Sequence, residues 1–189
     1  MARQFAEQAV EVARGLGDEQ LLIKALAELC STHFFAGEPD RGLPFGQESV
    51  ERARPLGDDV LLAGSLLLYL QAIGPVARSG PLFGEAIACT ERSGDHLTNS
   101  WLRNDAGYVA LAAGDIPAAR AHLDAAAHAG QQIGYENTAV PENLGLVLRA
   151  EGDPGGARSA FGASLRISRR NGGQLGHGLR HPRPGLPGR

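Results

Sequence analysis

Glycines recur along this 189-residue chain at a nearly constant interval. The glycines of a first set follow one another after 37, 40 and 38 residues, and each has a second glycine 20 residues later. In chain order the two sets together are Gly37, Gly57, Gly74, Gly94, Gly114, Gly134, Gly152 and Gly172. A fixed internal period of this size predicts an array of repeated structural units.

The residues around these glycines predict helical corners. Aspartate often comes next, as in Gly17-Asp18, Gly57-Asp58, Gly94-Asp95, Gly114-Asp115 and Gly152-Asp153. Glycine adopts the left-handed conformation that ends a helix, and aspartate accepts hydrogen bonds from the first amides of the next one. Between corners the apolar residues have helical spacing, as at Leu22, Leu26 and Leu29. We therefore expect pairs of amphipathic helices.

Small residues occupy matching places in each repeat. Five residues after the first glycine lie Gly42, Ser79, Ala119 and Ala157, and twelve after it lie Ser49, Ala86, Ala126 and Ser164. Small side chains allow paired helices to approach closely. The chain has 26 glycines and only 5% aromatic residues, which fits such close packing.

This pattern resembles the tetratricopeptide repeat, in which a small residue precedes a Gly-Asp corner and alanine and a large residue follow at set steps. The third and fourth repeats match best, through Gly107, Gly114, Asp115, Ala119, Leu123 and Ala126, and through Leu144, Gly145, Gly152, Asp153, Ala157 and Phe161. The resemblance implies an all-α, right-handed solenoid of antiparallel helical hairpins with a period of 37–40 residues. It spans residues 1–171, as a half repeat at 2–17 and repeats at about 18–57, 58–94, 95–134 and 135–171.

Longer repeats with such corners are similar to the C-terminal regions of large actinobacterial LuxR-type, ATPase-containing transcription regulators. The ATPase itself is not expected here, because Lys24, the single lysine, follows no glycine-rich phosphate loop. Residues 2–17 match only the second helix of a repeat. We therefore expect a fragment of a longer regulator whose preceding domains cover that helix.

Charge is divided unevenly along the chain. Residues 1–153 hold 11 basic and 21 acidic residues, whereas residues 154–189 hold seven arginines and no acid. The stretch at 172–189 is rich in glycine, proline and arginine, which predicts a disordered basic tail. Arginines of this end, such as Arg166, Arg169 and Arg170, either complement the last helix dipole or contact phosphates of a nucleic acid. Nucleic-acid binding by this chain alone ranks below protein binding, because no known module is recognised.

The sequence also predicts where the protein is located and how its two cysteines behave. No signal-peptide pattern opens it, so we expect a cytoplasmic protein. The uncharged run from Val60 to Ala77 has the length of a membrane span, but Gly64, Ser65, Gln71 and Gly74-Pro75 interrupt it, so no membrane partner is expected. Two cysteines, Cys30 and Cys89, suit small buried hydrophobes.

Catalytic and metal sites are not expected. The chain has no Gly-x-Ser-x-Gly elbow and no paired carboxylates in a pocket-forming context. His122 and His128 lie on different helix faces, whereas His177 and His181 have ligand spacing but lie among glycine and proline. We therefore predict neither an enzyme nor a bound cofactor.

A binding groove is the remaining candidate. The first helices of stacked pairs line a concave surface, and counting back from each corner glycine identifies their outward residues. The candidates are Lys24, Ser31, Phe35, Gln71, Trp101, Asn104, Tyr108, Glu142 and Arg149. Trp101, Asn104 and Tyr108 share a helix face suited to an extended peptide, although Trp101 and Tyr108 equally suit packing between repeats.

The leading function is therefore a non-catalytic module that binds a protein, a peptide or a small inducer as the sensor part of a bacterial transcription regulator. The alternative is a freestanding adaptor that assembles other proteins. An enzyme, or a nucleic-acid binder acting through the basic tail, ranks below both.

Overall fold

The computed structural model describes residues 2–74 and 79–171, and every regular element in them is helical. The basic tail expected at 172–189 lies outside the described residues. The elements are α1 (Ala2–Leu16), α2 (Glu19–Phe35), α3 (Pro39–Ala53), the 3₁₀ helix η1 (Arg54–Leu56), α4 (Asp59–Ile73), α5 (Ser79–Ser93), α6 (His96–Ala112), α7 (Ile116–Gln132), α8 (Ala139–Ala150) and α9 (Pro154–Arg170). The prediction of an all-α chain is thus confirmed for this part of the molecule.

The predicted corners are confirmed at the backbone. The eight corner glycines from Gly17 to Gly152 all have positive φ, between 65° and 82°. Residues with a Cβ avoid this left-handed region, so glycine is the residue that turns the chain there. Gly172, the ninth corner glycine expected, lies outside the described residues.

Aspartates begin several helices, as the sequence predicts. Asp18 accepts a hydrogen bond from the Leu21 amide at 2.9 Å, and Asp153 accepts one from the Gly156 amide at 2.8 Å. Asp58, Asp95 and Asp115 cap their helices in the same way. Each cap satisfies an amide that the helix leaves without a partner.

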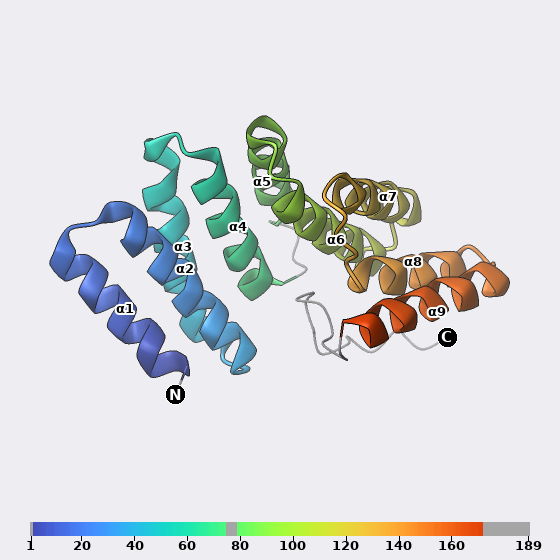
Figure 1. Cartoon of the computed structure of the whole chain (residues 1–189), viewed down its shortest axis with the longest axis horizontal. Coiled ribbons are helices and arrows are strands. Elements are labelled where there is room, and N and C mark those ends of the chain that lie inside the picture. The colour runs from blue at the N-terminus through green and yellow to red at the C-terminus, as the bar shows by residue number, and fades with distance from the viewer. Residues whose placement is uncertain (1, 75–78, 172–189) are drawn as a thin grey trace. The chain divides into compact units, whose positions relative to one another are not determined.

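The chain forms two compact units, the first ending at Leu102 and the second beginning at Arg103 within α6. In the first unit, consecutive helices from α1 to α5 contact one another, and α2 also contacts α4. In the second unit, α7 contacts α8 and α8 contacts α9. Figure 1 shows the helices of each unit packed side by side.

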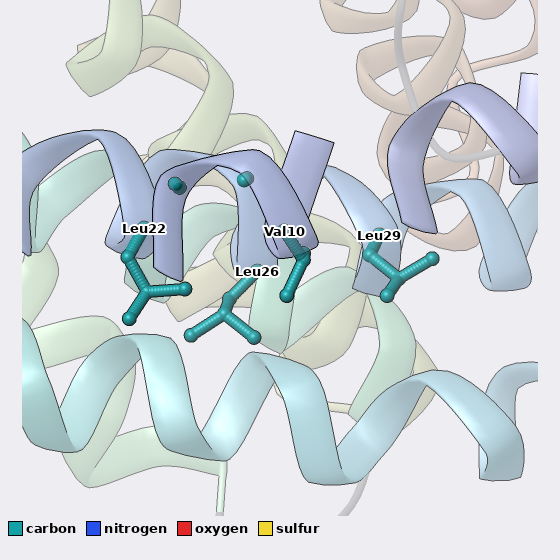
Figure 2. Packing of buried hydrophobic residues seen from close by; sticks show 6 residues of the cluster. Val10, Leu22, Leu26 and Leu29 are labelled. Atoms are coloured by element: carbon teal, nitrogen blue, oxygen red, sulfur yellow. The ribbon is translucent and has the colours of Figure 1, made fainter. Parts of the chain in front are cut away.

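Leucines of α2 form the core of the first unit. Leu22, Leu26 and Leu29 pack with Val10 of α1, and all four side chains are buried (Figure 2). In the second unit a smaller cluster of Ala119, Leu123 and Val147 joins α7 to α8.

The small residues lie where paired helices meet, as expected. Ser49 donates a hydrogen bond to the Ile23 carbonyl at 2.9 Å, and Ser164, at the same place in the last repeat, donates one to the Thr138 carbonyl at 2.9 Å. Both serines thus join the second helix of a pair to the first.

The uncharged run from Val60 to Ala77, which has the length of a membrane span, forms a core helix over the part that the structure describes. Val60 to Ile73 belongs to α4, and Leu61, Leu66 and Leu70 are buried within the first unit. Among the described residues, no helix combines the length and the apolar character that crossing a membrane requires. Residues 75–77, the end of that run, lie outside the described residues.

Candidate partner-binding surface

The first helices of the pairs, α2, α4, α6 and α8, carry the nine groove candidates. Five belong to the first unit and four to the second. Their exposure divides them into three classes, which are Lys24, Phe35, Glu142 and Arg149 (exposed), Trp101 and Tyr108 (half-buried), and Ser31, Gln71 and Asn104 (buried).

The end of α2 presents the clearest exposed aromatic group. Phe35 is 64% exposed, and the ring of Phe34 meets it edge-on, with centroids 5.2 Å apart. Lys24 is also exposed on α2, three helical turns earlier. This surface combines an aromatic contact with one positive charge.

Three candidates differ from the expectation that they face outward. Ser31 and Gln71 are buried in the first unit, at 6% and 7% exposed, and Asn104 is buried at 2%. The count from the corner glycine places each residue on the correct helix. It does not show how much of that helix its neighbours cover.

Asn104 lies in a network of amide and carboxylate groups. Its side-chain oxygen accepts a hydrogen bond from the amide of Asn143 on α8 at 3.0 Å. Its own amide donates to Asp105 at 3.2 Å. A buried polar group without such partners costs free energy, so this network joins α6 to α8 within the second unit.

Trp101 and Tyr108 lie on α6 and are each half-buried. Partial burial agrees with either of the two interpretations, contact with a partner or packing between helices.

A shallow groove on the second unit includes Arg149 together with residues that were not predicted from the sequence. It is lined by Arg149, Pro154, Ala157, Arg158, Phe161, Gly162 and Leu165. All but Arg149 belong to α9, which is a second helix, whereas the predicted groove residues belong to first helices. The available signal was Leu165, which stands where Val10 and Val50 stand in other repeats.

Both cysteines are buried thiols whose pKa values are raised. Both Cys30 and Cys89 are buried as free thiols. Burial raises the pKa of the Cys30 thiol to about 11 and also raises the pKa of the Cys89 thiol. Both therefore stay protonated at neutral pH.

Two histidines, His33 and His122, lie wholly or partly within the helix packing. His33 is buried and stacks on Phe45, with centroids 5.9 Å apart, and its Nδ1 lies 3.5 Å from a carboxylate oxygen of Glu38. Burial, aided by the positive charge of Arg103, lowers the pKa of His122. Within the described ranges, no cluster of three metal-ligating side chains forms, and His177 and His181 lie outside them.

Known proteins resemble this chain in fold and not in a sequence family. No protein-family model matches the chain, and no curated protein sequence matches it. Among solved structures, the chain is similar to the crystal structure of BtubC (BKLC) from P. vanneervenii, with a TM-score of 0.62 and 17% identity. The similarity covers 100% of this chain and 95% of that one. At this identity the comparison shows a shared all-helical fold.

Proposed function

We propose that this chain is a non-catalytic binding module, a right-handed solenoid of tetratricopeptide-like helical pairs that holds a protein or peptide partner. The aromatic pair at the end of α2, in which Phe34 is half-buried and Phe35 is exposed, carries the proposal. Phe35 offers most of its ring to solvent, and large aromatic side chains of this kind supply much of the energy at protein interfaces. Lys24 on the same helix adds attraction for a partner with an acidic group.

Substitution of Phe35 tests this binding surface. Phe35→Ala removes an exposed ring and creates no cavity, so a loss of binding reflects the surface rather than the fold. Phe5→Ala is the matched control, because Phe5 is also 64% exposed but lies on α1. Partners are captured from an extract of the source organism on immobilised wild-type chain and on each variant.

If the proposal is correct, the wild type and the Phe5→Ala variant retain a protein that the Phe35→Ala variant does not retain. Equal retention by all three chains contradicts this surface. Failure of the wild type to retain any protein contradicts the binding function itself. The burial of Asn104 makes Asn104→Ala unsuitable, because that variant breaks the hydrogen bond to Asn143.

We further propose that this module serves as the sensor part of a bacterial transcription regulator, which the resemblance of its repeats supports. The alternative remains a freestanding adaptor. The reading frame upstream of Met1 separates the two, since an in-frame ATPase supports the regulator and an independent gene with its own start supports the adaptor.

A further inference from the structure

The shallow groove on the second unit is lined by both helices of its last described pair, and we call it the α8–α9 groove. Arg149 of α8 lines it together with residues of α9 that include Arg158, Phe161 and Leu165. The side chain of Leu165 is 61% exposed. In the first unit, α4 packs against both helices of the preceding pair, α2 and α3. The α8–α9 groove is therefore a place where the first helix of a further pair would dock.

Leu165 has counterparts that first helices cover. It stands seven residues before its corner glycine, as Val10 and Val50 do. Val10 is 3% exposed and packs among leucines of α2, the first helix of the next pair (Figure 2). Val50 is 2% exposed, and α4, again the first helix of the next pair, packs on the helix that carries it. Leu165 thus marks a position that receives a first helix.

Arg158 stands at a second position that repeats along the chain. It lies 14 residues before its corner glycine, as Arg3 and Arg120 do. Arg3 lies 3.6 Å from a carboxylate oxygen of Glu38, and Arg120 donates a hydrogen bond to Glu151 at 2.9 Å. Glu38 and Glu151 are both next to the glycine that ends the following first helix. A first helix that docks on α9 should therefore end with a carboxylate near Arg158.

Arg169 stands at a third such position, three residues before its corner glycine, as Arg14 and Arg54 do. Arg14 lies 3.6 Å from Glu48, and Arg54 pairs with Glu85 at 2.9 Å. Both glutamates belong to the following second helix, nine residues before its corner glycine. The second helix of a docked pair should accordingly bring a carboxylate to Arg169.

The charge of α9 favours an acidic partner. The helix carries four arginines and no acidic residue. Arg170 pairs with Glu136 of the same unit, whereas within the part of the chain that the structure describes neither Arg158 nor Arg169 has an ion-pair partner. The stretch at 172–189 adds three more arginines and no acid, so it cannot supply the carboxylates. The charge on this face therefore calls for acidic groups from another molecule.

A second copy of the chain has no suitable pair to offer. The carboxylates that stand at these two places in its own repeats are Glu38, Glu48, Glu85 and Glu151, and each already pairs with an arginine of the same chain. Docking of a second copy would have to break such pairs and uncover the helices that carry them. A different protein with the same arrangement of carboxylates has no such cost.

We propose that the α8–α9 groove binds a helical pair of another protein, and that two carboxylates of that pair meet the arginines of α9. The first helix of the partner packs against Phe161 and Leu165, and a carboxylate at its C-terminal end meets Arg158. The second helix brings a carboxylate to Arg169. The groove shares no residue with the Phe35 surface, so this proposal does not rest on the proposed function.

A labelled peptide of residues 18–57 is the probe for this groove. It holds the α2–α3 pair and both kinds of carboxylate, Glu38 and Glu48. Fluorescence anisotropy follows the peptide as the full chain is added, and the wild type is expected to bind it. The helical signal of the mixture in circular dichroism should exceed the sum of its two components, because docking orders the peptide.

Substitution of Leu165 tests where the peptide binds. Leu165→Asp places a charge in the apolar contact and should weaken binding about tenfold or more. Ile133→Asp is the control, because Ile133 is an exposed apolar residue outside the groove, and it should bind as the wild type does. A wild type that does not bind the peptide overturns the proposal, as does binding that Leu165→Asp leaves unchanged.

Charge exchange tests the ion pairs. Arg169→Glu in the chain should weaken binding about fivefold or more, and Glu48→Arg in the peptide should restore it. Arg166→Glu is the matched control, because Arg166 is exposed on α9 but lies about 100° around the helix from Leu165. Equal losses for Arg169→Glu and Arg166→Glu, with no recovery on exchange, overturn the predicted pairing.

Sedimentation velocity on the full chain alone tests the choice of partner. The chain is expected to stay monomeric, because its own carboxylates at these places are engaged. Self-association that Leu165→Asp abolishes would place a second copy in the groove and would overturn the assignment to another protein. Circular dichroism of each variant alone checks that its helices are retained.

Discussion

In the first unit the glycines at the closest approach of two paired helices lie on the second helix, whereas in the second unit they lie on the first. Gly42 and Gly46 belong to α3, where a Cβ would lie 2.7 Å from the carbonyl oxygen and 2.7 Å from the Sγ of Cys30, respectively. Gly107 and Gly145 belong to α6 and α8.

The large partner changes sides accordingly. In the second unit, Leu123 of α7 and Phe161 of α9 lie over the glycines of the first helices, where an added Cβ would be 2.9 Å and 2.6 Å away. Close helix packing needs one side of the contact to be empty, and it does not matter which helix supplies the space. The two units differ in the atom that an added methyl group would meet first. That atom is a backbone oxygen at Gly42, and it is a side-chain carbon at Gly107 and Gly145.

The largest expected effect comes from Gly42→Ala. The new methyl group meets backbone that cannot rotate away, so the free energy of unfolding should fall by about 2 kcal/mol. Thermal unfolding followed by circular dichroism measures the change. Gly84→Ala is the matched control, since Gly84 is an exposed glycine inside α5 with open space around it. That control should stabilise the chain by up to about 1 kcal/mol through helix propensity.

Removal of the helix caps should cost less and should not distinguish the units. Asp18→Ala in the first unit and Asp153→Ala in the second each remove a hydrogen bond to a helix-start amide. Each should lower the free energy of unfolding by about 1 kcal/mol. Urea unfolding measures both, and a large inequality would show that the corners are not equivalent.

Gly145→Ala should have a smaller effect than Gly42→Ala. Its methyl group meets the ring of Phe161, which is half-buried beside a groove and is able to turn away. We expect a loss of about 0.5 kcal/mol after the gain in helix propensity. Adding Phe161→Leu should recover part of it, and a double-mutant cycle measures this coupling. Equal losses at Gly42 and Gly145 would remove the proposed difference between the units.

The smallest effect concerns pH. His122 stands where the first repeat has Phe45, and burial lowers the pKa of His122 below its usual 6.5. Below pH 6.5 the unfolded chain therefore binds this proton more readily, so the free energy of unfolding should fall as the pH drops. His122→Gln should lose this dependence between pH 6.5 and 5. Glu85 and Glu151, whose pKa values are lowered from 4.5 by arginine partners, act only at lower pH.

An NMR titration checks the cause directly. The His122 ring signal should titrate with a midpoint below 6.5. A midpoint at or above 6.5 would contradict burial as the dominant influence.

The sequence predicted the helical content and the corners well because these depend on local chemistry. A glycine with positive φ and an aspartate cap act within a few residues of their own position, so their spacing is visible in the chain. The small residues at Ser49 and Ala126 likewise marked the contact between paired helices, because the period repeats the same contact.

The binding surface was predictable only in part. Phe35 lies on the surface as expected, whereas Ser31, Gln71 and Asn104 lie in the interior. These positions were predicted by counting along the helix from the corner glycine. Such a count gives the direction of a side chain relative to one partner helix. The count does not show whether a third helix covers the residue, as α8 does where Asn143 donates a hydrogen bond to Asn104.

By itself the sequence determined that this chain is helical, where most helices begin and end, and which positions must stay small. The tertiary structure decided which polar residues are buried, which unit places its glycines on which helix, and which apolar side chains of α1 and α9 remain exposed. The physical reason is the separation along the chain between the groups that interact. Capping and turning involve atoms a few residues apart, whereas burial depends on segments distant in the chain that compete to cover the same surface.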